Sequence, residues 1–167
     1  MIKFIALLKM AAKLDLDPFD LKLLERLQAD ARTPVPALAE AVGLSAPACY
    51  LRIRRLREIG AIEREVALVR PRTLGWGVSM IVLVILEREG RQTIDELMRK
   101  LTAIPQVLAL WHVTGEFTFV AHVVARDMED YDLLATRLFS HDERVRSFQT
   151  LVAMREARSR MPLPAAD

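Results

Sequence analysis

The chain has 167 residues, of which 52% are hydrophobic and 28% charged, a composition typical of a globular protein with one medium or two small cores. No apolar run reaches the roughly 18 residues that cross a membrane, and a single cysteine, Cys49, excludes a disulfide framework within one chain. Lys and Arg outnumber Asp and Glu by 13 to 9 in residues 1–75, whereas Asp and Glu lead by 13 to 11 in residues 76–167. This asymmetry favours nucleic-acid binding by the first half.

The start of the chain, MIKFIALLKMAAKL, is a poor signal peptide, because Lys9 and Lys13 interrupt its apolar core and no cleavage site follows. We therefore expect a cytoplasmic protein without a membrane partner. Met10 is an alternative initiator, so residues 1–9 need not belong to the native chain.

A first helix is predicted to begin after Asp17 and to end near Ala31. Asp17 suits the N-cap, Pro18 the first helical position, and Asp20 adds negative charge to the first turn. An amphipathic apolar stripe follows at Phe19, Leu23, Leu24 and Leu27.

Residues 37–62 predict a helix-turn-helix. Leu38 and Val42 lie one helical turn apart, and Gly43 gives the flexible backbone at which a helix ends. Ser45 is a good N-cap for the next helix. The buried face of that helix follows i, i+4, i+7 spacing at Cys49, Ile53 and Leu56.

The opposite side of this second helix is basic, and a basic outward face just after a turn is the geometry of DNA-reading helices. An ordinary helical hairpin with a solvated charged face is the alternative. The residues of this helix expected to contact DNA are Ser45, Ala46, Pro47, Tyr50, Leu51, Arg54 and Arg55.

A strand is predicted over residues 62–69, although Arg64 interrupts its apolar alternation. A strand directly after a DNA-reading helix is a wing, from which Arg64 is expected to contact phosphate. We therefore place a winged helix-turn-helix domain at residues 15–69. A linker follows at residues 70–78, where Pro and Gly concentrate.

Residues 79–156 predict a second domain with the element order βαββαβ. The expected ranges are a strand at 79–86, a helix at 93–104, strands at 107–113 and 117–125, a helix at 127–138 and a strand at 145–154. Thr93 and Glu96 predict a capping box for the first of these helices. The order is the split βαβ pattern of ferredoxin-like domains, so the fold class is α+β. The strands are apolar on both sides, and we expect the sheet face without helices to pack against a second subunit.

A winged helix-turn-helix followed by a βαββαβ domain resembles the leucine-responsive/asparagine regulator (Lrp/AsnC, feast/famine) family from about Leu16 to Met154. The segments that carry the resemblance are LDPFDLKLLERLQADAR, LAEAVGLSAPACYLRIRRLREIGAI, RPRTLG and IPQVLALWHVTGEFTFVAHVVARDMEDY. It implies a transcription regulator that dimerises through its second domain and assembles further, to tetramers or octamers. A dimer presents two DNA-reading helices, so the expected target is double-stranded DNA with an imperfect palindrome.

The resemblance also implies a small-molecule effector, usually an amino acid, bound between dimers. The family's glycine–acid–aromatic–aspartate turn appears here as Gly115, Glu116, Phe117 and Thr118, with threonine in place of the aspartate. Glu116 is then expected to face the ammonium group. A plain β-turn is the alternative. The implied effector site comprises Val113, Thr114, Gly115, Glu116, Phe117 and Thr118.

No catalytic, metal or cofactor motif stands out, so no enzyme and no cofactor is expected. His112 and His122 lie on adjacent predicted strands, but no cysteine or carboxylate pair joins them at ligand spacing. Cys49 is interpreted as a small buried hydrophobe. The remaining alternative is an oligomeric small-molecule-binding protein of ferredoxin-like type without a DNA-binding role. The outward arginines separate the two, because an assembly helix exposes apolar residues instead.

Overall fold

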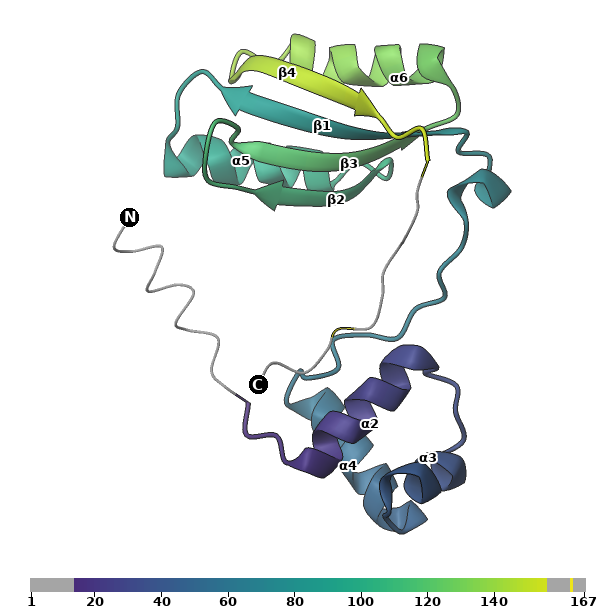
Figure 1. Cartoon of the computed structure of the whole chain (residues 1–167). Helices are drawn as coiled ribbons and strands as arrows, with labels where there is room; N and C mark the ends of the chain where they lie inside the picture. Colours follow the sequence, from purple (N-terminus) through teal and green to yellow (C-terminus); the bar gives the residue numbers. More distant parts are fainter. Residues whose placement is uncertain (1–13, 156–162, 164–167) are drawn as a thin grey trace. The chain divides into compact units, whose positions relative to one another are not determined.

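The structure is a computed structural model that describes residues 14–155 and residue 163. The predictions for residues 1–9 and Met10 lie outside the described residues. The chain divides between Ala67 and Leu68 into two compact units (Figure 1). None of the described helices is long and apolar enough to span a bilayer.

The N-terminal unit contains three helices, α2 (Pro18–Ala29), α3 (Val35–Val42) and α4 (Ala46–Glu58). Asp17 caps α2, and Asp17 and Asp20 each accept the other's backbone N–H in a capping box. Gly43 ends α3 in the left-handed region with φ 78°, and Ser45 caps α4. The predicted caps and the predicted turn at Gly43 are thus confirmed, and the first helix ends at Ala29 rather than near Ala31.

The core of this unit is built from the faces that periodicity predicted. Cys49, Ile53 and Leu56 of α4 are buried against Leu23 of α2 and Leu38 of α3. Cys49 has no exposed surface, and burial raises the pKa of its thiol. Cys49 is therefore the small buried hydrophobe that the sequence predicted.

The strand predicted at residues 62–69 is wrong. The described chain forms no strand between Gly60 and Val78, and its first ordered element there is a 3₁₀ turn, Pro71–Leu74. A strand needs a partner for its backbone groups, and nothing described in the N-terminal unit offers one. Residues 63–70 are all exposed, including Arg64.

The C-terminal unit is a four-stranded antiparallel sheet in the order β2-β3-β1-β4 (Figure 1). Its elements are β1 (Val78–Leu86), α5 (Arg91–Thr102), β2 (Val107–His112), β3 (Phe119–Ala125), α6 (Met128–Ala135) and β4 (Val145–Val152). The α+β fold class with a ferredoxin-like domain is confirmed.

Alternate residues of β1 separate the two faces of this sheet. Met80, Val82 and Val84 are fully buried in a core that includes Leu97 of α5 and Leu134 of α6. The opposite face has no described helix over it, and its β1 residues are only half-buried. Large apolar side chains on this open face, assigned by strand register, are Ile81, Leu83, Ile85, Trp111, Val120 and Leu151.

Several predicted boundaries move by a few residues. α5 begins at Arg91 with Gly90 as its N-cap, not at Thr93, because Ile94 N–H donates to the Gly90 carbonyl at 2.9 Å. The capping box predicted for Thr93 is absent; the carboxylate of Glu96 accepts from Gln92 instead. β2 ends at His112, β3 begins at Phe119, and β4 ends at Val152.

Candidate DNA-binding helix and effector turn

Each of the four arginines of α4 is paired with a carboxylate. Arg54 Nε lies 3.3 Å from Glu58 Oε1, one helical turn along. Arg57 Nη2 lies 2.7 Å from Glu65 Oε1. The basic face that the sequence predicted is therefore present, but within the unit its charge is balanced by acids.

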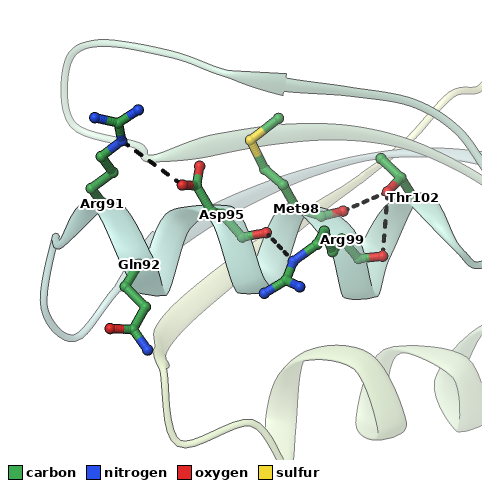
Figure 2. Close-up of a pocket in the computed structure, with 6 residues that line it drawn as sticks. All are labelled: Arg91, Gln92, Asp95, Met98, Arg99 and Thr102. Carbon is green, nitrogen blue, oxygen red and sulfur yellow. Dashed lines mark hydrogen bonds and ion pairs between the residues drawn. The ribbon is translucent and has the colours of Figure 1, made fainter.

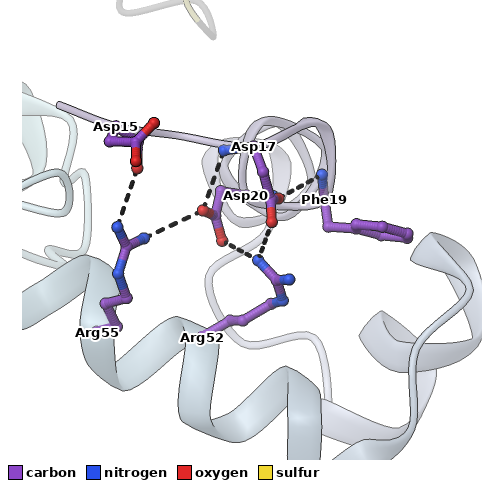
Figure 3. Close-up of polar contacts among 6 residues, drawn as sticks. All are labelled: Asp15, Asp17, Phe19, Asp20, Arg52 and Arg55. Atoms are coloured by element: carbon purple, nitrogen blue, oxygen red, sulfur yellow. Dashed lines mark hydrogen bonds and ion pairs between the residues drawn. The ribbon is translucent and has the colours of Figure 1, made fainter. Parts of the chain in front are cut away.

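The other two arginines join α4 to the start of α2 (Figure 3). Arg52 Nη1 donates to Asp17 Oδ2 at 2.6 Å and to Asp20 Oδ1 at 2.9 Å. Arg55 donates to Asp20 Oδ2 at 3.2 Å and to the backbone carbonyl of Asp15 at 2.9 Å. One carboxylate, that of Asp20, thus accepts from two guanidinium groups.

Asp20 is only 1% exposed, so these partners supply the hydrogen bonds that water cannot. The pKa of Asp17 is lowered by the hydrogen bond from the Asp20 backbone N–H and by the Arg52 guanidinium. The same carboxylates raise the pKa of Arg52. The guanidinium of Arg52 also lies 5.5 Å from the centre of the Phe19 ring. This network fixes α4 against the N-terminus of α2.

The residues predicted to contact DNA differ in exposure and in whether their side chains are already hydrogen-bonded. Tyr50 is 57% exposed and Leu51 is 54% exposed. Ser45, Pro47 and Arg54 are also exposed, whereas Ala46 is half-buried. The guanidinium of Arg55 is held by Asp20 and the Asp15 carbonyl. Arg64 belongs to the irregular segment after α4.

Sequence reasoning missed Arg52 and Asp20 as a pair. Arg52 follows Cys49 by three positions, so it lies about 60° from Cys49 around the helix, at the edge of the buried stripe. An arginine at the edge of a buried stripe needs an acidic partner on a neighbouring helix. The Asp-x-x-Asp at the start of α2 was the available signal for that partner.

The predicted effector turn joins β2 to β3. Val113 N–H donates to the Thr118 carbonyl at 3.0 Å and closes the turn. Thr114, Gly115 and Glu116 are exposed, and Val113 and Phe117 are half-buried. Gly115 has φ 131°, a conformation that favours glycine. The turn therefore offers exposed backbone and one exposed carboxylate.

Thr118 does not face solvent. It is 1% exposed, its backbone N–H donates to the Val84 carbonyl at 2.8 Å, and its hydroxyl donates to Glu89 Oε1 at 2.9 Å. Glu89, in the loop between β1 and α5, was not among the predicted site residues. No local pattern signals this contact, because 29 residues separate the pair and only strand pairing brings them together.

A hollow of about 840 Å³ lies along the outer side of α5 (Figure 2). Its lining residues are Arg91, Gln92, Asp95, Met98, Arg99 and Thr102, all from the same helix. No second element of the described part of the chain lines it. Among the described residues, no group of three or more His, Cys, Asp and Glu is placed to hold a metal ion. His122 Nε2 lies 2.7 Å from Ser79 Oγ, across the β1–β3 pair.

A helix-turn-helix unit with an arginine-rich second helix, followed by a ferredoxin-like domain, defines a DNA-binding transcription regulator. The family model described as the AsnC-type helix-turn-helix domain matches residues 16–57, and that described as the Lrp/AsnC ligand binding domain matches residues 79–163. The chain belongs to the Lrp/AsnC family of transcriptional regulators, as its sequence predicted.

Curated relatives and solved structures agree with this assignment. The chain is 36% identical to the HTH-type transcriptional regulator y4tD of Sinorhizobium fredii, over 90% of this chain and 89% of that protein. It is 34% identical to the HTH-type transcriptional regulator AldR of Mycolicibacterium smegmatis, over 89% and 87%. The crystal structure of an AsnC family transcriptional regulator from Agrobacterium tumefaciens superposes with a TM-score of 0.82 at 28% identity, covering 89% of this chain and 97% of that one.

Proposed function

We propose that this regulator binds an imperfect palindrome as a dimer, with the N-terminal half of α4 of each subunit in a major groove. The observation that carries the proposal is the exposed surface of α4, where Ser45, Tyr50, Leu51 and Arg54 face solvent beyond a buried opposite face. Two equivalent helices bind half-sites about one helical turn apart, roughly 34–36 Å. Chromosomal DNA as the target supports a cytoplasmic location.

Arg54 is the best candidate for reading a base. Among the described residues, its guanidinium is held only by an exposed ion pair to Glu58, in which the side chains are 60% and 63% exposed. Such a pair contributes little and is easily exchanged for a guanine contact. Arg55 would first have to leave Asp20 and the Asp15 carbonyl. We therefore assign base reading to Arg54, phosphate contacts to Arg57 and Arg64, and a structural role to Arg55.

Gel-shift titration tests this assignment. A duplex selected by the protein from random DNA is compared with its scrambled sequence. Arg54→Ala should lose about 1–3 kcal/mol of discrimination between the two. The matched control Arg64→Ala should weaken binding to both duplexes alike. An unchanged affinity ratio in Arg54→Ala would remove Arg54 from base reading, and equal binding of both duplexes by the parent would refute sequence-specific recognition.

We further propose that the C-terminal unit binds a small-molecule effector, an amino acid or a related metabolite, at the turn 113–118. The exposed backbone at Gly115 lets peptide N–H groups approach a ligand carboxylate closely. Phe117, half-buried, offers an apolar surface beside it. The family's assembly between dimers would enclose this turn, which supports a tetramer or octamer built from dimers.

A further inference from the structure

The loop between β1 and α5 brings a second carboxylate to the proposed effector turn. Glu89 Oε1 accepts a hydrogen bond of 2.9 Å from Thr118 Oγ1. The Thr118 hydroxyl in turn accepts a hydrogen bond of 3.3 Å from the backbone N–H of Leu86, the last residue of β1. Because β1 pairs antiparallel with β3, the end of β1 and the start of β3 lie at the same end of the sheet (Figure 1).

The two partners differ in what they offer a ligand. Thr118 is 1% exposed, and its hydroxyl already gives its proton to Glu89 and accepts from Leu86. Glu89 is exposed. A carboxylate has about four acceptor positions, and the Thr118 hydrogen bond occupies one of them. Thr118 therefore cannot contact a ligand directly and influences ligand binding through Glu89, the carboxylate to which it donates.

Glu89 also differs from Glu116, the acid that we expected from the sequence to face the ammonium group. Glu116 is exposed in the turn, and its side chain makes no hydrogen bond or ion pair to another described residue. Fixing such a side chain upon binding costs rotamer entropy. The buried hydroxyl of Thr118 already restricts Glu89, so a cation meets a carboxylate whose position is set in advance.

We infer that Glu89 is the specificity-determining acid of the effector site and selects compounds that carry a protonated primary amine, with Thr118 as its positioning residue. The inference rests on the proposed effector function. An ammonium group brings three donors and a positive charge to a carboxylate that has acceptor positions free, and charge-assisted hydrogen bonds are the stronger kind. Thr118 has no carboxylate of its own, but its hydrogen bond holds the carboxylate of Glu89 at this site.

The test uses thermal-shift titration of the full-length protein with the twenty L-amino acids. Each one that stabilises the protein is then compared with its 2-hydroxy acid, in which a hydroxyl replaces the ammonium group. The parent should prefer the amino acid. Glu89→Gln keeps a side-chain oxygen that accepts from Thr118, but its Kd for the amino acid should rise about tenfold or more. Glu89→Gln should also lose the preference for the amino acid over its 2-hydroxy acid.

Three further variants separate binding from folding. Glu87→Gln changes an exposed glutamate of the same loop and should bind like the parent. Thr118→Ser keeps the hydroxyl and should also bind like the parent, whereas Thr118→Val should lose affinity by a smaller factor than Glu89→Gln. A Glu89→Gln protein that binds the amino acid as the parent does overturns this inference and leaves the effector proposal standing. A parent that no amino acid stabilises refutes both.

Discussion

At the scale of single residues, one carboxylate organises the DNA-binding unit. Asp20 accepts from Arg52 and Arg55 and from the backbone N–H of Asp17, and it is almost fully buried. A buried carboxylate with several donors is stable only while those donors remain. The side chains of Arg52 and Arg55 are 30% and 44% exposed, and without Asp20 they would lose their common anchor on α2.

Asp20→Ala should therefore lower the free energy of unfolding of the N-terminal unit by about 2 kcal/mol, because it removes a hydrogen-bonded ion-pair network and part of the α2 cap. Chemical unfolding followed by far-UV circular dichroism measures the helical transition. Both tryptophans, Trp76 and Trp111, lie in the other unit, so their fluorescence transition should not move. Glu25→Ala, an exposed position on the same helix, is the control and should change little. A parent-like helical transition in Asp20→Ala would contradict this account.

A second residue, Asp142, plays a comparable part in the C-terminal unit. Its carboxylate accepts from Arg144 Nη2 and from Lys100 Nζ, both at 2.7 Å, and it is 8% exposed. Arg144 first, and then Lys100, hold the pKa of this carboxyl well below its ordinary range. Lys100 Nζ also donates to the Leu138 carbonyl, so the cluster ties α5 to the segment before β4.

The lowered pKa makes a prediction about acid stability. A carboxyl with a depressed folded-state pKa stabilises the fold above its unfolded pKa of about 4, and this contribution is lost as the pH falls through the folded value. Asp142→Asn should lower stability at neutral pH and should flatten the decline below about pH 4. Urea unfolding followed by tryptophan fluorescence across this pH range measures both. If the stability of Asp142→Asn falls as steeply below about pH 4 as that of the parent, groups other than Asp142 cause the acid sensitivity.

At the scale of elements, two arginines of the proposed recognition helix α4 are paired with acids in or just after that helix. Glu58 and Glu65 each sit beside an arginine that faces solvent. These carboxylates add negative charge close to where phosphates are expected, and they compete with phosphates for the same guanidinium groups. If α4 binds DNA as proposed, these acids should lower the non-specific affinity of the protein for DNA.

Glu58→Gln and Glu65→Gln should each raise affinity for cognate and scrambled duplexes alike, by a few-fold at low salt, and the double variant should raise it further. The slope of log affinity against log salt should become steeper, because freed arginines release more counterions. Glu129→Gln, on α6 in the other unit, is the charge-matched control. Unchanged or lower affinity in both single variants would show that these acids lie away from the DNA.

The elements themselves were largely readable from the sequence, because each depends on local periodicity and caps. Asp17, Gly43 and Ser45 marked helix boundaries correctly, and the continuous apolar run at residues 79–86 was enough to identify a strand with a buried face. The strand predicted at residues 62–69 was wrong, because a strand also requires a partner strand and the periodicity of one segment gives no information about a partner. The hydrogen bonds from Arg55 to Asp20 and from Thr118 to Glu89 could not be predicted from the sequence either, because each joins residues that are distant in sequence.

At the scale of the whole molecule, we expect the open face of the sheet to hold two subunits together. Trp111 is 50% exposed and Leu151 is 45% exposed on that face, beside the half-buried Ile81, Leu83 and Ile85. An apolar patch of this kind marks an interaction surface. A second copy is the occupant consistent with a palindromic target, because two-fold symmetry pairs the same face with itself.

Leu83→Arg tests this assembly in the full-length chain. Leu83 pairs in register with Val120 on one side and Gln149 on the other, so an arginine there would place an unpaired charge in the middle of a buried interface. Sedimentation at micromolar concentration should give a monomer. Affinity for the palindromic duplex should fall about a hundredfold or more, because each half-site then binds alone. Leu133→Arg, at a helix position that is 68% exposed, should leave both unchanged.

A folded Leu83→Arg protein that remains dimeric would show that another surface holds the subunits together. Retention of the parent's DNA affinity by a monomeric variant would instead separate operator binding from dimerisation.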